Sequence, residues 1–193
     1  MSPTLVHLTI ILLRAAVHVT LIAAQSVDGF ITRHSEPGSG FTSLADKTHF
    51  RNALRTFDCR VMGATTYRVS RDITRRAADS GSIQRVVTRT PAAFTSDAIS
   101  PVLEFTDRPP AEILLGLEKH GCRRCALVGG AQVHSLFLRS GCVDELWLTV
   151  EPLLFGRGTP LLSEEAEVKL SLLSHEPLSP DTLLLKYRVK PVE

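Results

Sequence analysis

A strong charge imbalance is missing from this sequence, in which 22 lysines and arginines stand against 20 aspartates and glutamates, for a formal net charge of +2. Proteins that bind nucleic acid or acidic membranes carry a much larger basic excess, so neither partner is expected. Cysteine is also scarce, with four residues in 193, and a chain of this length buries a core without a disulfide framework. These shortages predict a single cytoplasmic domain over residues 1–193 with reduced thiols.

One apolar run stands out near the N-terminus. Residues 5–24 contain 15 apolar residues in 20, which is long enough for a membrane span or a signal peptide. Arg14 interrupts the run, and a central arginine costs about 2.5–3.5 kcal/mol in a membrane helix. A signal peptide requires a positively charged segment before its apolar run, and no Lys or Arg precedes this run. We therefore expect a buried strand from His18, preceded by an extension over residues 1–16; a membrane-tethered protein is the alternative.

Turn-forming residues divide the rest of the chain into short segments. Strands are expected over 18–25, 60–62, 84–88, 125–128 and 144–150, with a final antiparallel pair over 172–175 and 182–189. Helices are expected after an N-cap at Ser43, from Gly63, over 111–120 and over 131–140, whereas 71–82 is expected to be a polar loop. In the helix after Ser43, one apolar face is expected to hold Leu44, Phe50, Leu54 and Phe57. Because strands alternate with helices and then dominate the end, the pattern predicts an α/β fold with a mostly parallel sheet and an antiparallel edge.

Two strand-to-helix junctions are rich in glycine and hydroxyl groups. In Ala126-Leu-Val-Gly-Gly-Ala131, a buried strand runs through two glycines into a helix. Glycine lets a ligand approach the backbone, and a helix N-terminus favours an anion such as pyrophosphate; a simple tight turn is the alternative. Gly63-Ala-Thr-Thr66 repeats the arrangement, with Thr65 or Thr66 either capping the helix or donating to a phosphate. Two such junctions predict a bound dinucleotide.

A third junction bears on the choice of dinucleotide. Thr88-Arg89 follows an expected strand, and a hydroxyl beside a guanidinium suits a 2′-phosphate. This pair predicts NADPH rather than NADH, although an arginine in a solvated loop has the same sequence pattern. No Gly-x-Gly-x-x-Gly motif occurs, which excludes the Rossmann fingerprint.

Four motifs in order carry a family resemblance: Ser26–Gly29, Asp58–Tyr67, Val128–Ala131, and Cys142–Pro152 running into Gly156–Gly158. Together they resemble the reductase domain at the C-terminus of bacterial riboflavin-biosynthesis deaminase-reductases, which has the dihydrofolate-reductase fold. The resemblance implies a three-layer α/β/α domain that uses NADPH to transfer a hydride to a small heterocyclic or ribosylamino substrate, such as a ribosylamino-pyrimidine phosphate. It also implies a homodimer that pairs through terminal strands of the sheet, with residues 145–154 as an apolar surface.

The resemblance implies roles for individual residues as well. Asp46 would polarise or protonate the substrate, although an aspartate in a first helical turn also suits the helix dipole. Asp28 is the second candidate, in an Asp-Gly pair that is typical of a turn. The implied substrate contacts are Asp28, Ser39 and Arg55. The implied cofactor contacts are Ala24, Phe41, Thr66, Gly129, Gly130, Ala131, Gln132 and Val133. The strand-to-helix junctions add Gly63, Thr65, Thr88 and Arg89 to the predicted cofactor site.

Two departures from the family pattern concern residues that bind the substrate rather than the cofactor. A glutamate that holds the substrate's sugar in the riboflavin enzymes is Val128 here, which removes a charge-assisted contact worth about 1.5–3 kcal/mol. Residues 70–78 lack the Asp-Pro-x-Leu-x-x-Arg stretch of those enzymes. The fold and the cofactor therefore carry over more directly than the substrate.

Metal chemistry and a role without catalysis are the remaining questions. A zinc deaminase needs H-x-E and then P-C-x-x-C; His34-Ser-Glu36 supplies the first motif, but Cys122-Arg-Arg-Cys125 lacks the proline, so no metal is expected. The two cysteines fit small buried residues or a redox pair. A homodimer that binds a nucleotide as a sensor, without catalysis, is the alternative function.

Overall fold

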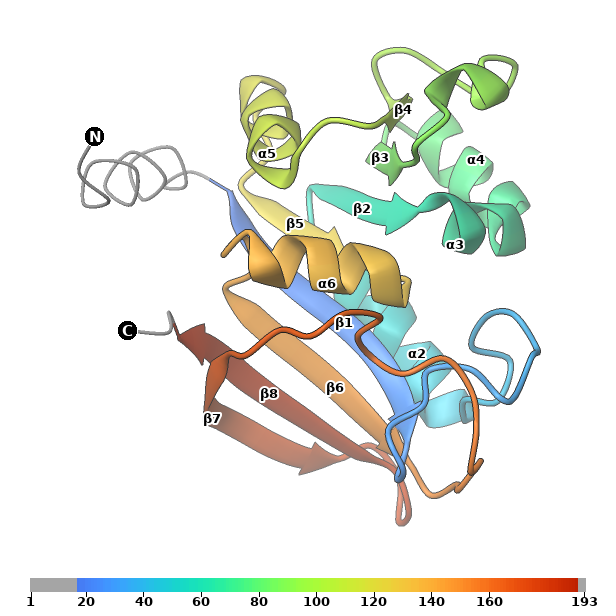
Figure 1. The fold of residues 1–193 in the computed structure, drawn as a ribbon, viewed down its shortest axis with the longest axis vertical. Helices are drawn as coiled ribbons and strands as arrows, with labels where there is room; N and C mark the ends of the chain where they lie inside the picture. Colours follow the sequence, from blue (N-terminus) through green and yellow to red (C-terminus); the bar gives the residue numbers. More distant parts are fainter. Residues whose placement is uncertain (1–16, 191–193) are drawn as a thin grey trace.

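The computed structural model describes residues 17–190. Its centre is one eight-stranded sheet in the order β4-β3-β2-β5-β1-β6-β8-β7 (Figure 1). The strands are β1 (His18–Ser26), β2 (Cys59–Gly63), β3 (Ile83–Val87), β4 (Leu103–Thr106), β5 (Arg124–Leu127), β6 (Glu145–Glu151), β7 (Lys169–Pro177) and β8 (Leu183–Lys190). The pairs from β4 to β6 are parallel, and β8 and β7 close the sheet in antiparallel pairing. The predicted mostly parallel sheet with an antiparallel C-terminal edge is confirmed.

Helices cover both faces of this sheet and make three layers. They are α2 (Leu44–Leu54), α3 (Ala64–Val69), α4 (Arg71–Asp79), the short 3₁₀ helix η1 (Pro91–Phe94), α5 (Pro110–Lys119) and α6 (Ala131–Arg139). On one face, α5 and α6 bury side chains such as Leu117 and Phe137 against β1, β2, β5 and β6. On the other face, Phe50 and Leu54 of α2 pack near Ile22, and Tyr67 of α3 packs near Met62. Alternating residues of each strand thus serve two cores.

Local signals placed most elements, and three expectations were wrong. The segment expected as a polar loop over 71–82 contains helix α4, because Thr74 and Ala78 are buried on one side of an otherwise charged sequence. Strand β4 was missed; its four residues pair with β3 and form the end of the sheet. The apolar face expected for α2 was wrong at both ends: Leu44 is 77% exposed, and Phe57 lies beyond the helix, which ends at Leu54.

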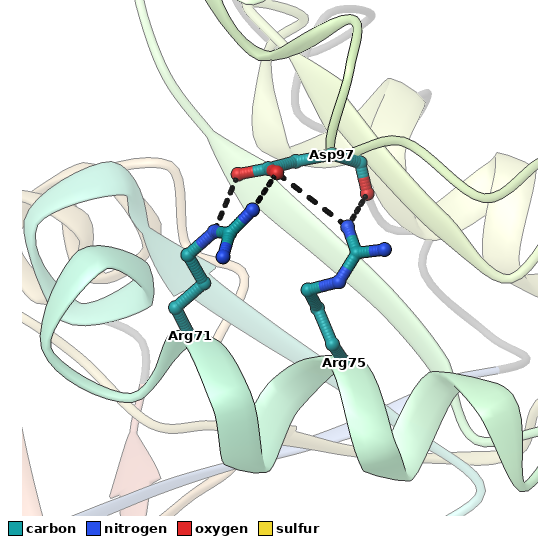
Figure 2. Close-up of polar contacts among 3 residues, drawn as sticks. All are labelled: Arg71, Arg75 and Asp97. Atoms are coloured by element: carbon teal, nitrogen blue, oxygen red, sulfur yellow. Dashed lines mark hydrogen bonds and ion pairs between the residues drawn. The ribbon is translucent and has the colours of Figure 1, made fainter.

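Helix α4 is attached to the loop after η1 by a charged cluster (Figure 2). Arg71 Nε donates to Asp97 Oδ2 at 3.0 Å, and Arg71 Nη2 pairs with Asp97 Oδ1. Arg75, one turn later on α4, donates from Nη1 to the backbone oxygen of Asp97 at 3.0 Å. Arg71 foremost holds the pKa of the Asp97 carboxyl at about 2. This cluster therefore fixes the helix that replaces the expected loop.

The apolar run near the N-terminus has one part that can be described. From His18 it forms β1, as predicted, in the interior of the sheet between β5 and β6. The expected extension over residues 1–16 lies outside the described residues. Within residues 17–190, no helix is both long and apolar enough to span a membrane.

Candidate active site

Two helix starts meet at the carboxyl edge of the parallel strands. Gly63 caps α3 and Gly130 caps α6, and neither helix start has a capping side chain. The Gly63 amide donates to the Gly129 carbonyl at 2.7 Å, which joins the two starts. A Cβ on Gly63 would lie 3.0 Å from Val133 Cγ2, and one on Gly130 would lie 3.5 Å from Thr66 Oγ1. Free amides from two helices at one point form a cradle suited to a pyrophosphate.

His134 explains why the residue behind this cradle must be small. Gly129 has φ +105°, and a Cβ there would lie 3.2 Å from His134 Nε2. The ring is 1% exposed, and its Nδ1 lies 3.0 Å from the Leu161 carbonyl. Burial lowers the pKa of His134 to about 4, so the imidazole is neutral near pH 7 and Nδ1 donates to that carbonyl. His134 thus supports the glycine pair from inside the core.

The other predicted cofactor residues lie along the same edge. Gly63 is level with Val87 on β3, so Thr88 and Arg89 follow directly beside it. Ala24 lies three residues beyond Leu21, the last β1 residue paired with β5, and Gly130 lies three residues beyond its partner Leu127. The structure therefore brings the predicted set to one edge, while contacts with a cofactor, including those of Thr65, Thr66, Ala131 and Gln132, stay predictions.

Asp46 lies beside this edge, on helix α2, which packs against Trp147 of β6. It is 7% exposed, and its amide donates to the N-cap Ser43 Oγ at 3.1 Å. Its carboxyl faces the hydroxyl of Thr149, whose register partner across the sheet is Ala24. Burial raises the pKa of Asp46, and the charge of Glu151 adds to the rise, while Thr149, Thr42 and His49 oppose it. Asp46 therefore binds a proton more readily than an ordinary aspartate, next to the position predicted for the nicotinamide.

Glu151 and its partners were missed by sequence reasoning. Glu151 is 2% exposed at the end of β6. Its Oε1 accepts from Ser43 N at 2.8 Å and from Ser43 Oγ at 2.9 Å, and its Oε2 accepts from Thr182 Oγ1 at 3.1 Å. One signal was present: Trp147, Thr149 and Glu151 alternate along a buried strand and therefore share one face. Polar residues on that face mark a site rather than a core.

The predicted substrate contacts are spread over the two ends of α2 and a nearby loop. Ser39 precedes the N-cap of α2, and Arg55 is its C-cap, so the 11-residue helix, about 16 Å long, separates them. Asp28 accepts from the amides of Phe155 and Gly156 at 3.0 and 2.7 Å and from Ser26 Oγ at 2.6 Å. These contacts give Asp28 a structural part in joining two loops. Substrate contact by any of the three stays a prediction.

The loop before α2 carries the remaining predicted cofactor residue. Phe41 packs edge-on against Phe155, with ring centroids 5.1 Å apart. Phe41 therefore lies where the loops before α2 and after β6 meet. Its contact with a cofactor is untested.

The two departures from the family are both visible in the fold. Val128 packs between the apolar cluster of Met62 and that of Ile22, so the wall is apolar where the riboflavin enzymes have a carboxylate. Residues 70–78 mostly form α4, which the Asp97 cluster holds against the loop after η1. Both differences lie on the sheet face that carries Asp46.

The cysteines lie away from this edge. All four are buried free thiols, and burial raises the pKa of Cys122 to about 12, which suits small core residues rather than reactive thiolates. Among residues 17–190, no group of three or more His, Cys, Asp or Glu side chains is placed to hold a metal ion.

Comparison with known proteins shows a matching family model and several structures of similar fold. The family model for the RibD C-terminal domain matches residues 17–184. A pyrimidine reductase-like protein from Corynebacterium diphtheriae is similar at 18% identity and TM-score 0.70, over 96% of this chain and 95% of that one. A dihydrofolate reductase from Enterococcus faecalis, solved with NADP(H), is similar at 17% identity and TM-score 0.61, over 90% and 97% of the two chains.

A third structure is longer than this chain. The Thermotoga maritima diaminohydroxyphosphoribosylaminopyrimidine deaminase/5-amino-6-(5-phosphoribosylamino)uracil reductase is similar at 18% identity and TM-score 0.70, over 91% of this chain and 57% of that one. No curated protein matches by sequence. At these identities the solved structures establish a shared dihydrofolate-reductase-like fold.

Proposed function

The chain belongs to the RibD C-terminal domain family, whose reductases use NAD(P)H, and from this membership we propose that it is an NADPH-dependent reductase of a small heterocyclic or ribosylamino substrate. One observation carries the proposal. The starts of α3 and α6, which have no side-chain cap, lie at the edge of the sheet that carries Ala24, and Asp46, a buried carboxyl with a raised pKa, lies near Thr149, the register partner of that alanine. These positions support a phosphate cradle and a proton donor at one edge of the sheet.

The residues present fit the dinucleotide. The starts of α3 and α6 have no side-chain cap, so their first amides can bind a phosphate, and Thr88 and Arg89 follow β3 at the same edge. The reduced nicotinamide would supply a hydride to an electrophilic carbon of the substrate. Asp46 would donate its proton to the adjacent nitrogen, so that a C=N bond becomes a CH–NH unit.

The residues near Val128 favour a substrate without a ribosyl phosphate. Val128 offers no hydrogen bond to a sugar, and Arg71 and Arg75 of α4 are already paired with Asp97. A flat heterocycle with a ring nitrogen suits the apolar wall and the Asp46 carboxyl. The ribosylamino-pyrimidine phosphate of riboflavin synthesis is the second candidate, because the family model covers nearly the whole described chain.

Binding of NADPH is the first test. Trp147 is the single tryptophan, and it lies on the same strand face as Thr149, so its fluorescence should respond to a ligand bound near Asp46. We expect micromolar binding of NADPH and weaker binding of NADH. Gly130→Asp places a carboxylate at the cradle and should weaken NADPH binding at least about 100-fold, because a buried like charge repels the pyrophosphate.

Gly116→Asp is the matched control, since Gly116 lies on α5 with no atom within 4 Å of an added Cβ. Equal loss of binding in both variants, or no binding by the unmodified protein, would refute the cofactor assignment. Hydride transfer from NADPH to any pterin, flavin precursor or ribosylamine would exclude the sensor alternative. Binding without transfer to any of them would favour it.

We also propose that the chain forms a homodimer, and that its contact surface is strand β7 rather than residues 145–154. Residues 145–154 contain β6, both of whose edges are already paired, with β1 and β8. The free edge on that side of the sheet belongs to β7, where Leu170, Leu172 and Leu173 are 41–53% exposed. Sedimentation velocity of Leu172→Lys against the unmodified chain tests this surface, and an unchanged dimer would place the contact elsewhere.

A further inference from the structure

The start of helix α6 has no lysine or arginine beside its glycine pair. Residues 129–133 read Gly-Gly-Ala-Gln-Val, and the neighbouring residues 63–66 read Gly-Ala-Thr-Thr. Arg68, the arginine of α3, lies over the ring of Phe94, 5.0 Å from its centroid. A diphosphate carries two negative charges, whereas a helix N-terminus supplies about half a positive charge. The helix start therefore leaves part of the charge of such a ligand uncompensated.

One ionisable base lies against the glycine pair, and it is buried. His134, the fourth residue of α6, is 1% exposed. Its Nε2 lies 3.2 Å from the position that a Cβ on Gly129 would take, and Thr66 Oγ1 lies 3.9 Å from the same position. Because residue 129 is a glycine, no side chain fills that position. His134 Nε2 and the hydroxyl of Thr66 therefore border one space at the start of the helix.

The two ring nitrogens of His134 have different surroundings. Nδ1 lies 3.0 Å from the Leu161 carbonyl, and it donates to this oxygen because a carbonyl only accepts. Nε2 is buried and has no hydrogen-bond partner among the described residues. A buried polar atom without a partner costs free energy, and the bond to Leu161 already holds the ring. The unpartnered nitrogen beside Gly129 therefore points to a role in ligand binding.

The charged side chains on the elements around His134 are directed elsewhere. Arg139, at the opposite end of α6, pairs with Glu164 of the segment that follows Leu161. Burial lowers the pKa of His134 to about 4, the Leu161 carbonyl opposes this, and no charged side chain of residues 17–190 contributes. An anion bound beside Gly129 would therefore be the first charge to act on the ring. Because Nε2 is shielded from water, the attraction would be weakly screened.

We propose that a diphosphate bound at the start of α6 is accompanied by a proton: His134 Nε2 takes the proton from solvent, and the imidazolium balances charge that the helix dipole leaves uncompensated. The inference rests on the proposed function, because the diphosphate is that of NADPH. An opposite charge within about 4–6 Å favours a protonated ring by about 10–1000-fold. Dinucleotide affinity should therefore rise about tenfold from pH 8 to pH 5, and it should level off below pH 4, where the free protein is itself protonated at His134.

Calorimetry of NADP⁺ binding at pH 6, repeated in two buffers with different heats of ionisation, counts the protons taken up. NADP⁺ keeps the diphosphate and is stable in acid, which NADPH is not. Its 2′-phosphate also titrates near pH 6, at about the same pKa as other phosphate monoesters, so the informative quantity is the difference between two proteins. His134→Asn can keep a donor to Leu161 but does not titrate. The unmodified protein should take up about half a proton more than His134→Asn, and the variant should lose the tenfold gain in affinity at low pH.

His120→Asn is the matched control, because it removes an exposed imidazole at the C-cap of α5 and should leave the proton uptake unchanged. NMR of nitrogen-15-labelled imidazoles gives a second readout on the unmodified protein, whatever the stability of the variants. Without ligand at pH 6, His134 should carry its proton on Nδ1 alone. With saturating NADP⁺, Nε2 should become protonated as well.

The outcomes separate this inference from the proposed function. Equal proton uptake by the unmodified protein and His134→Asn, or a ring that stays neutral in the NADP⁺ complex at pH 5, would overturn the role of His134 and leave the cofactor in place. Absence of NADP⁺ and NADPH binding at every pH would refute both the inference and the proposed function.

Discussion

Two aspartates with nearly the same burial have opposite surroundings. Asp46 is 7% exposed and Asp97 is 9% exposed, and both lie on the same side of the sheet. Asp97 is held by the guanidinium groups of Arg71 and Arg75, which keep the pKa of its carboxyl at about 2. Asp46 has hydroxyl groups and a neighbouring carboxylate around it, and its pKa is raised, first by burial. The arginine partners outweigh burial at Asp97 and keep it a fixed ion, whereas burial outweighs the hydroxyl partners at Asp46 and leaves its pKa raised.

The comparison distinguishes a structural role from a chemical one. The Asp97 cluster joins α4 to the loop after η1, and both carboxylate oxygens of Asp97 are paired with Arg71 (Figure 2). Asp46 lies near Thr149, the register partner of Ala24, at the same edge of the sheet as the starts of α3 and α6. A carboxyl with a perturbed pKa beside a proposed ligand site is the stronger functional candidate.

Among substitutions that test the difference between Asp46 and Asp97, Asp46→Asn should have the largest effect, and the effect should be on the reaction rate. Loss of a general acid lowers rates by about 10²–10⁴-fold, and the amide cannot deliver the proton. The stability effect has the opposite sign. Because the folded pKa of Asp46 is raised, the unmodified protein loses stability as the pH rises through that value, and asparagine does not ionise. The variant should therefore gain stability relative to the unmodified chain between pH 4 and pH 8.

Urea unfolding at the two pH values, alongside single-turnover hydride transfer, checks both halves. A variant that retains the rate would remove Asp46 from the reaction. A stability difference independent of pH would show that the Asp46 pKa is ordinary.

Asp97→Asn should give a smaller effect, and on stability rather than on turnover. Arg71 and Arg75 are 49% and 33% exposed, so water replaces part of what they lose, and we expect a cost of about 1–2 kcal/mol. Because the pKa of Asp97 is lowered, the ion pair stabilises the fold at pH values above 3.8, the ordinary aspartate pKa. This stabilisation is lost as the pH falls toward about 2. The two proteins should thus converge in stability over that window, as followed by chemical unfolding.

Turnover should stay within about twofold of the unmodified rate in Asp97→Asn, since no contact joins Asp97 to the cradle. A large loss of rate with an unchanged melting temperature would contradict the division drawn between the two aspartates.

Arg75→Gln should give the smallest effect. Arg75 donates to the Asp97 backbone oxygen at 3.0 Å but approaches its carboxylate only at 3.5 Å, and Arg71 keeps the stronger pair. We expect about 0.5–1 kcal/mol of destabilisation and no change in NADPH affinity. An affinity loss in calorimetry would instead assign Arg75 to the cofactor site.

Sequence reasoning located one of these aspartates and missed the other, for a physical reason. Ser43 and Asp46 follow local rules of helix capping, and the glycine junctions depend on neighbours in the chain, so both were predictable. Asp97 depends on arginines more than 20 residues away, on a helix that was itself expected as loop. Glu151 reaches Ser43 across more than 100 residues. Local patterns placed the elements, whereas contacts distant in the chain had to come from the fold.

The bonds of Asp28 have a consequence for how the molecule opens. Its carboxylate receives the amides of Phe155 and Gly156, and close by Thr159 N donates to Thr32 Oγ1 at 2.8 Å. These hydrogen bonds join the segment before α2 to the segment after β6, so neither segment can leave the body of the domain without breaking its bonds to the other. They share one opening free energy and should exchange their amide hydrogens as one cooperative unit.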